Sequence, residues 1–170
     1  YKALSHLYEL GHRKIAIIKG EENSQIGDYR YNSYVEFLQE KKIFNQKFIK
    51  NGDFTRESGY RAAKELMEKK ERPTAIFAIS DLMAIGAIQA IQDSGYNVPE
   101  DVSVLGFDNI KACEYISPKL TTVAQNAIAI GRESANSIIL RLENRNISKK
   151  ILIEPELVKR NSCKKLGGID

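Results

Sequence analysis

Short runs of apolar residues recur along the first two thirds of the chain, spaced as in successive strand–helix units. They begin near Ile15, Phe48, Ala75 and Val102, and helical spacing of apolar positions appears between them. The runs lack the alternation of apolar and polar residues that a half-exposed strand shows, which is typical of strands covered on both faces. This pattern predicts an α/β fold with a doubly wound, parallel sheet.

Three helices are predicted between these strands. The first covers about residues 30–42, and the second covers 57–70 behind Thr55 as N-cap. The third begins at Asp81 and ends at Gly95, a residue type that favours helix C-termini. Each helix follows a strand closely, as the connections of a parallel sheet require.

The two ends of the chain depart from this alternation. Residues 1–10 show the pattern of the second half of a helix, and a short strand is expected at 120–123. A long helix is predicted from Asn126, as N-cap, to about residue 144, and two strand pieces kinked at Pro155 are expected within 151–158. The apolar stripe of the long helix comprises Ile128, Ala135, Ile138, Ile139 and Leu142.

The composition indicates one domain without crosslinks. A chain of 170 residues buries roughly 70% of its unfolded surface, enough for a core of its own. Cys113 and Cys163 lack the spacing of a disulfide framework or a zinc site. No apolar run reaches the ~18 residues of a membrane span, and no signal-peptide pattern precedes the first strand. We therefore expect a cytoplasmic protein without a membrane partner, cut from a longer chain.

The formal net charge of +4 is mild, and its basic pairs are spread over predicted helix ends and loops. Binding to nucleic-acid phosphates needs cations clustered on one face, so a solvated surface is favoured and no direct contact of this chain with DNA is expected. The pairs are Lys41-Lys42, Lys69-Lys70, Lys149-Lys150 and Lys164-Lys165.

Enzyme motifs are absent from the sequence. It has no GxGxxG, GxxxxGK[ST] or GxSxG spacing, and His6 and His12 lack the i, i+4 spacing of a metal pair. One alternative is a magnesium site of Glu21, Glu22 and Asp81, as in receiver domains, although Asp81 as a helix cap is favoured. We expect no catalysis, no metal and no cofactor.

Residues 98–108, VPEDVSVLGFD, carry the strongest indication of function. A buried strand within this segment ends in Asp108, at the edge of the sheet where α/β proteins bind their ligands. A carboxylate there can accept hydrogen bonds from hydroxyl or ring N–H groups. The segment therefore predicts recognition of a small polar molecule, while capping of the following turn is the alternative.

Several segments in register resemble the effector-binding domain of LacI/GalR-type bacterial transcription regulators. Besides residues 98–108, Arg30 ahead of Tyr34, and Gly131, the matching segments are LYELGHRKIAIIKG at 7–20, PTAIFAISDLMAIGA at 73–87, PKLTTV at 118–123 and ELVKRNS at 156–162.

The resemblance implies a periplasmic-binding-protein-like fold of type I, with two lobes and a ligand between them. Residues 15–107 and 151–162 would form mainly the C-terminal lobe, whereas 1–10 and 120–144 would belong to the N-terminal lobe. The family's helix-turn-helix has no counterpart in this sequence, which therefore resembles a repressor fragment.

The resemblance also assigns effector contacts. Arg30 matches a ligand-facing arginine whose planar fork suits paired oxygens, with a surface ion pair as the alternative. Phe54 could stack on a ring or pack beneath a loop. Ser80 stands where the family often has Asn, beside Asp81. Further positions that face ligand in relatives are Ser24 and Ile26, and Ile26 offers no hydrogen bond to a sugar.

The helix from Asp81 has an apolar surface wider than one sheet face needs. We interpret the excess as a homodimer interface, with denser packing inside the monomer as the alternative. The expected interface residues are Ala84, Ile85, Ile88 and Ile116.

These observations favour an effector-sensing module of a LacI-type repressor. It would bind a small sugar-like or nucleobase-like effector between two lobes and bias DNA binding by the missing helix-turn-helix. The alternative is a solute-binding protein of a sugar transporter, which would have the same fold.

Overall fold

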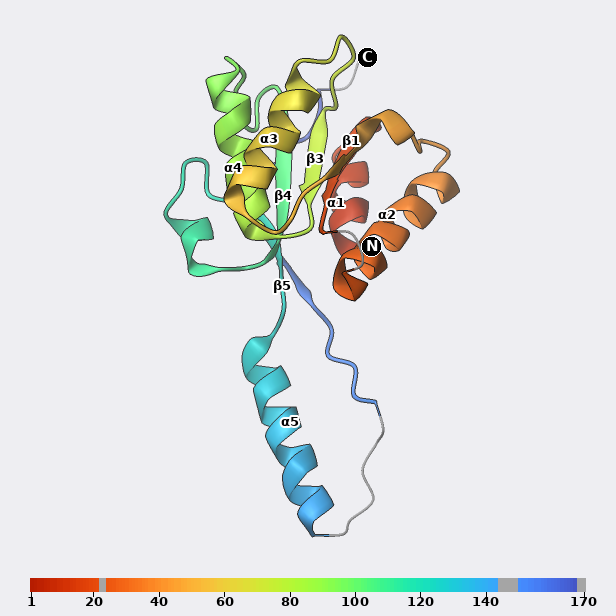
Figure 1. Ribbon diagram of the computed structural model, residues 1–170, viewed down its shortest axis with the longest axis vertical. Coiled ribbons are helices and arrows are strands. Elements are labelled where there is room, and N and C mark those ends of the chain that lie inside the picture. Colours follow the sequence, from red (N-terminus) through yellow and green to blue (C-terminus); the bar gives the residue numbers. More distant parts are fainter. Residues whose placement is uncertain (22–23, 144–149, 168–170) are drawn as a thin grey trace.

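One sheet organises the chain in the computed structural model, which describes residues 1–21, 24–143 and 150–167 (Figure 1). Within these residues the sheet has six strands in the order β2-β1-β3-β4-β5-β6, of which the first five are parallel and β6 is antiparallel to β5. The predicted α/β class is therefore confirmed. The strands are β1 (Ile15–Lys19), β2 (Ile49–Asn51), β3 (Ala75–Ala78), β4 (Ser103–Asp108), β5 (Thr121–Ala124) and β6 (Glu156–Val158).

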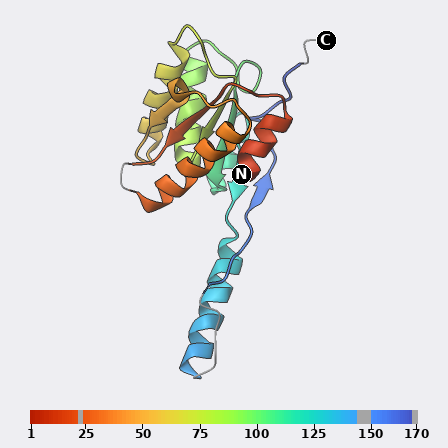
Figure 2. The same cartoon turned by 90° about the vertical axis from the view of Figure 1, so that its right-hand side faces the viewer.

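Helices cover both faces of the sheet, as the sequence predicts (Figures 1 and 2). Helices α1 (Lys2–Glu9) and α2 (Gln25–Glu40) lie on one face, and α3 (Arg56–Met67) and α4 (Asp81–Asp93) lie on the other. This sandwiching explains the uninterrupted apolar runs, because every residue of β3 is buried.

Side-chain caps fix where the helices begin. Thr55 accepts the Ser58 amide and Asn126 accepts the Ala129 amide, as predicted for α3 and the last helix. Ser24 accepts the Gly27 amide, so α2 begins at Gln25, earlier than expected. Ser80 rather than Asp81 caps α4, since its hydroxyl accepts the Met83 amide.

Helices α3 and α4 pack with their backbones in close approach. A Cβ at Gly59 would overlap the Met83 backbone, and a Cβ at Gly86 would overlap the Arg56 backbone. Helix α4 is thus covered by α3 on one side and by the sheet on another, which accounts for its broad apolar surface. The placement of Ala84 and Ile88 in a dimer interface is wrong, because both are buried within this chain.

The N-terminal helix belongs to the same layer as α2. Its buried residues Ala3, Leu4 and Leu7 pack into the core, and β5 pairs with β4 in the sheet. The sequence analysis placed 1–10 and 120–144 in a lobe apart from 15–107, and for residues 1–10 and the strand at 121–124 the structure shows instead that they join the same sheet and core.

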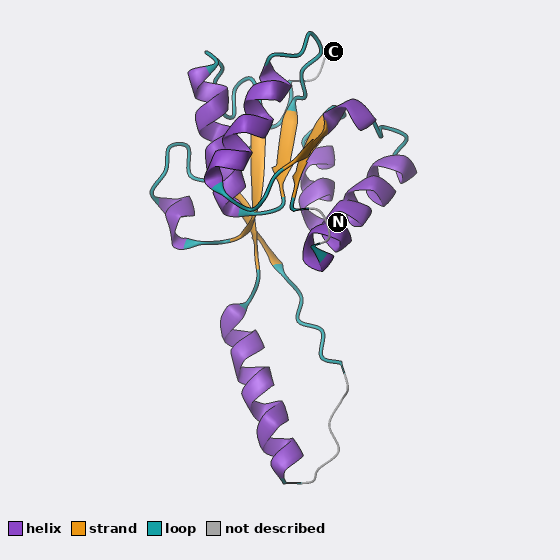
Figure 3. Cartoon of the chain, in the orientation of Figure 1, coloured by secondary structure: helices purple, strands orange, loops and turns teal. Residues whose placement is uncertain are grey.

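Helix α5 (Ala127–Leu142) projects beyond the carboxyl edge of the sheet (Figures 1 and 3). None of its residues is buried, and Ile128 and Leu142 are 86% and 79% exposed. Its expected end near residue 144 lies outside the described residues. The chain returns through residues 150–155 without a strand, so only the piece after Pro155 forms β6.

Candidate functional site

Arg30 and Asp108 meet at the carboxyl edge of the sheet. The Nη2 atom of Arg30 lies 3.6 Å from the Oδ1 atom of Asp108. Arg30 comes from the second turn of α2, which follows β1, and Asp108 is the last residue of β4. Two segments far apart in the sequence therefore bring opposite charges to the edge where α/β sheets bind ligands.

The Arg30 side chain is fixed by two further contacts. Its Nη1 atom donates to the carbonyl of Ile79, the residue after β3, at 2.5 Å. Its guanidinium carbon lies 3.8 Å from the centroid of the Phe107 ring, a cation–π contact. These two contacts orient the planar guanidinium group. The side chain is still 17% exposed, so part of it faces solvent.

Asp108 is placed by an unusual backbone and by Gln125. Its φ is 116° and that of Asn109 is 56°, both in the region that L residues rarely adopt. The Oδ1 atom of Asp108 accepts the Gln125 Nε2–H at 2.7 Å. Among the described residues, Oδ2 has no hydrogen-bond partner, so this oxygen can accept a donor from a bound molecule.

Arg160 supports the turn after Asp108. Its guanidinium donates to the Leu120 carbonyl and the Asn109 side chain, each at 2.8 Å, and lies 3.3 Å from the Glu114 carboxylate. Since Asn109 directly follows Asp108, these bonds restrict the direction of the Asp108 side chain.

Both charges of the central pair are partly removed from water. Burial raises the pKa of Asp108 above its ordinary value, against the opposing effects of the Gln125 hydrogen bond and the Arg30 charge. Burial also lowers the pKa of Arg30, against the opposing effect of Asp108. Burial thus opposes the charge of both groups, while their mutual attraction over 3.6 Å favours it.

Asp81 lies beneath this site rather than on its surface. It is fully buried, and its carboxylate accepts the Ile110 amide at 2.8 Å, the Cys113 thiol at 3.1 Å and the Thr122 hydroxyl at 2.6 Å. The expectation that Asp81 contacts an effector is therefore wrong. Its role is to tie α4 to β5 and to the turn around η2 (Lys111–Glu114).

The same contacts bear on the magnesium alternative. Both oxygens of Asp81 accept protein donors, and Glu22 lies outside the described residues. Among residues 1–21, 24–143 and 150–167, no group of three or more His, Cys, Asp or Glu side chains could hold a metal ion.

The remaining predicted residues differ in accessibility. Ser24 and Ser80 cap helices, and Ser80 is buried. Phe54 has a φ of 67° and packs its ring over Gly20, where a Cβ would overlap it, so it is shielded on that side. Ile26, in the first turn of α2, is 60% exposed.

Sequence reasoning missed Phe107, Gln125 and Arg160 as contributors to this site. Phe107 directly precedes Asp108 in the sequence, and this position alone could have indicated that it lies near the site. Gln125 follows the strand that neighbours β4, and strands that end side by side present their next residues together. Arg160 lies two residues after β6, inside the segment ELVKRNS that carries part of the resemblance, but that segment assigned it no role in the site.

Residues 4–163 match the family described as the periplasmic binding protein-like domain. The chain belongs to this family. As a periplasmic binding protein-like domain, it has a ligand-binding fold whose carboxyl edge holds the pair of Arg30 and Asp108.

Three known proteins show where this domain occurs. The helix-turn-helix-type transcriptional repressor PurR of Haemophilus influenzae strain PittEE is 37% identical over 98% of this chain and 51% of its own length. A sugar-binding LacI-family transcriptional regulator from Escherichia coli, solved with phosphate, has a TM-score of 0.91 at 32% identity, over 97% of this chain and 60% of that one. The lac repressor dimer bound to operator and an anti-inducer has a TM-score of 0.89 at 28% identity, over 95% and 56%.

This periplasmic binding protein-like domain spans about half the length of the curated relatives it matches. Those relatives are LacI-family transcription repressors rather than enzymes or transporter components, which confirms the predicted resemblance. No helix among the described residues is both long and apolar enough to cross a bilayer.

Proposed function

We propose that this chain is the effector-sensing module of a LacI-type transcription repressor. The observation that carries the proposal is the pair of Arg30 and Asp108 at the sheet edge, with one carboxylate oxygen open to a donor. The relatives named above are repressors, and one is a sugar-binding regulator. A small sugar-like or nucleobase-like molecule would bind here and bias DNA binding by a domain outside these 170 residues.

Each side chain would contribute differently to binding. The Arg30 fork would donate to a pair of oxygens, and Asp108 Oδ2 would accept a hydroxyl or ring N–H. Such charge-assisted bonds contribute about 1.5–3 kcal/mol each. Ile26 and the ring of Phe54 would supply apolar contact, while Ser24 and Ser80 would act through the loops they cap rather than by direct contact.

The exposed helix α5 supports a two-lobed arrangement. In this proposal the described sheet and its four covering helices form the C-terminal lobe, and α5 packs into the N-terminal lobe. Its uncovered apolar residues need such a partner, because apolar patches of this extent are rarely exposed in a functional monomer. They are Ile128, Ile130, Ile138, Ile139 and Leu142.

We also propose a cytoplasmic homodimer with a corrected interface. Ile85 and Ile116 are only partly buried, and Leu82 and Tyr115 beside them are 47% and 73% exposed. The Gln92 side chain donates to the Ser117 carbonyl, so the segment that carries Tyr115 runs along α4. This surface provides apolar area that the interior of the chain does not use.

The decisive test uses the full-length repressor. Calorimetry with a panel of monosaccharides and purine bases should yield a ligand, and Arg30→Lys and Asp108→Asn should each weaken its binding at least tenfold. Asp93→Asn, on the far end of α4, is the matched control and should leave affinity unchanged. Binding that is insensitive to both site variants would contradict the proposal.

A further inference from the structure

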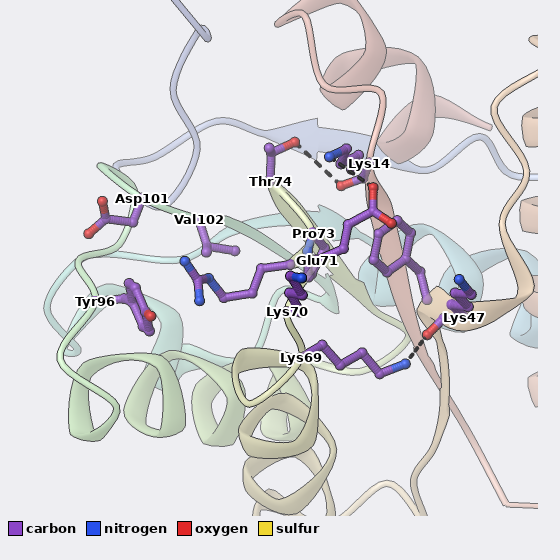
Figure 4. Close-up of a pocket in the computed structure, with 12 residues that line it drawn as sticks. Lys14, Lys47, Lys69, Lys70, Glu71, Pro73, Thr74, Tyr96, Asp101 and Val102 are labelled. Atoms are coloured by element: carbon purple, nitrogen blue, oxygen red, sulfur yellow. Dashed lines mark hydrogen bonds and ion pairs between the residues drawn. The ribbon is translucent and has the colours of Figure 1, made fainter.

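A cavity opens at the amino edge of the sheet, at the end opposite to Arg30 and Asp108. Its volume is about 850 Å³. Lys14, Thr74 and Val102 line it, and each stands directly before one of the strands β1, β3 and β4 (Figure 4). The start of parallel strands at one edge therefore gathers these residues. The segment 69–73, which follows α3, and η1 (Gln46–Phe48) form further parts of the wall. We call this cavity the amino-edge pocket.

The amino-edge pocket has a surplus of positive charge. Five cationic side chains line it against two acidic ones, Glu71 and Asp101. The Glu71 carboxylate lies 2.9 Å from the Lys14 ammonium, and Asp101 accepts the Asn97 amide at 2.7 Å, so both acids already have donors. The cations are Lys14, Lys47, Lys69, Lys70 and Arg72.

Most of these cations lack an acidic partner. The ammonium groups of Lys47 and Lys70 form no hydrogen bond or ion pair with any described residue. The ammonium of Lys69 donates to the Lys47 carbonyl, which directs it across the pocket (Figure 4). The positive charges of Lys47 and Lys70 have no partner to give up within the part of the chain that the structure describes, so a bound anion would replace only water around them.

The pocket also offers a flat aromatic surface. The Arg72 guanidinium lies 4.7 Å from the centroid of the Tyr96 ring. Buried Phe48, Pro73 and Val102 form apolar parts of the wall. A guanidinium stacked with an aromatic ring is suited to both a phosphate oxygen and a planar base.

The sequence shows only part of this clustering. The pair Lys69-Lys70 is predicted to be solvated, and Arg72 follows it in the same segment, yet the fold adds Lys14 and Lys47 from other segments. Charges that are scattered along the chain thus share one concave surface.

We propose that the amino-edge pocket binds a small organic phosphate with at least two adjacent phosphate groups, of the nucleoside polyphosphate class. Its volume lies within the 300–1,000 Å³ typical of small-molecule sites. Several convergent cations match a multiply charged anion. A nucleic-acid strand would instead need a groove with cations along its length, whereas these cations surround a pocket.

This site is separate from the candidate effector site. Strands β3 and β4 run from Thr74 and Val102 at the pocket to Ile79 and Asp108 at the opposite edge. Binding at the amino-edge pocket therefore needs neither Arg30 nor Asp108.

Calorimetry with inorganic pyrophosphate and with ATP tests the proposal on the full-length protein. We expect one site per chain, with affinity that falls as salt rises. Lys47→Gln combined with Lys70→Gln should weaken binding at least tenfold. The matched control is Lys64→Gln with Lys111→Gln, which removes the same charge from exposed positions outside the pocket and should leave the affinity unchanged, as should Asp108→Asn.

The two probes distinguish the sources of the phosphates. Tighter binding of ATP that Tyr96→Ala reduces to the level of pyrophosphate would identify a nucleotide. Equal affinity for both probes would assign recognition to the phosphates alone. The proposal is overturned if neither probe binds, if the control pair weakens binding as much, or if a 20-nucleotide single strand binds more tightly than ATP with the same dependence on Lys47 and Lys70.

Discussion

The carboxylate of Asp81 accepts the Thr122 hydroxyl at 2.6 Å, linking the first turn of α4 to β5 beneath the pair of Arg30 and Asp108. Its second oxygen accepts the Ile110 amide two residues after Asp108. The backbone that carries the candidate ligand contact is thus fixed by a buried acid from another helix.

Asp81→Ala should destabilise the fold by on the order of 3 kcal/mol. The substitution leaves the partly buried Ile110 amide and the buried Thr122 hydroxyl without their acceptor, and such losses cost about 1–3 kcal/mol each. Urea unfolding measures the change. Asp93→Ala is the control, because Asp93 is exposed and bonds only the Tyr60 hydroxyl in the described structure, so its cost should stay below about 1 kcal/mol. Equal costs would show that Asp81 has no special structural role.

Gly86→Ala should lower the free energy of unfolding by about 2 kcal/mol. Alanine favours a helix over glycine, but its methyl group would overlap the Arg56 backbone and push α3 from α4. Gly131→Ala in α5 meets no atom within 4 Å and should stabilise by up to about 1 kcal/mol. Thermal unfolding of the two variants should therefore shift in opposite directions.

His12 should make stability depend on pH between about 4 and 6.5. Its Nε2 atom faces the Lys164 carbonyl at 3.2 Å and must donate, so Nδ1 can accept the Thr74 hydroxyl at 3.1 Å only while the ring is neutral. Burial lowers its pKa to about 4.

The sign follows from proton binding. Between the two pKa values the unfolded chain binds more protons at His12 than the folded chain, so stability rises with pH. The contribution, about 3 kcal/mol by linkage, is present above pH 6.5 and lost as pH falls towards 4. NMR titration should find His12 uncharged at pH 5.5, and His12→Gln should flatten this part of the pH profile. A measured pKa near 6.5 would contradict the expectation.

Asp108→Asn should separate binding from stability. Burial raises the pKa of Asp108, so the folded state binds more protons there than the unfolded state, and stability falls as pH rises from the ordinary aspartate range through the raised pKa. Asparagine removes this charge and tolerates a positive φ. At pH 7 the melting temperature should match or exceed that of the native protein, although effector affinity falls at least tenfold. Near pH 3, where Asp108 is protonated in both states, the variant should be no more stable than the native protein. A large loss of stability of the variant at pH 7 would refute the argument.

The dimer proposal distinguishes two neighbouring isoleucines. Ile85→Asp in the full-length protein should yield a folded monomer, because Ile85 is only partly buried. Ile88→Asp should instead reduce folding, since Ile88 is 3% exposed within one chain. Light scattering with circular dichroism reports both effects. A folded dimer in the Ile85 variant would place the interface elsewhere.

Local sequence signals predicted most of the scaffold. Apolar runs located the strands, and Thr55 and Asn126 marked helix starts because a capping side chain acts on an amide three residues away. Asp108 was expected at the carboxyl end of its strand, where α/β sheets bind ligands, and Arg30 was expected from the family resemblance. The structure brings the two side chains together, and their contact with an effector stays a prediction.

Long-range packing explains what the sequence did not predict. Ala84 and Ile88 were assigned to a partner because nothing local reveals that glycines let α3 approach so closely. The burial of Asp81 was not predictable, because the groups that donate to it come from segments about 30 and 41 residues away in the sequence. Its assignment to a ligand therefore missed these partners. The cations of the amino-edge pocket likewise come from several loops that only the sheet order brings together.

Gln125, which donates to Asp108, immediately precedes Asn126, the residue that caps α5. The 16 residues of α5 extend for about 24 Å at 1.5 Å per residue. A rotation of roughly 5° at that junction would displace the far end of the helix by about 2 Å. A small change in the hydrogen bond between Gln125 and Asp108 would thus move the far end of α5 by ångströms, because the helix amplifies a rotation at its start.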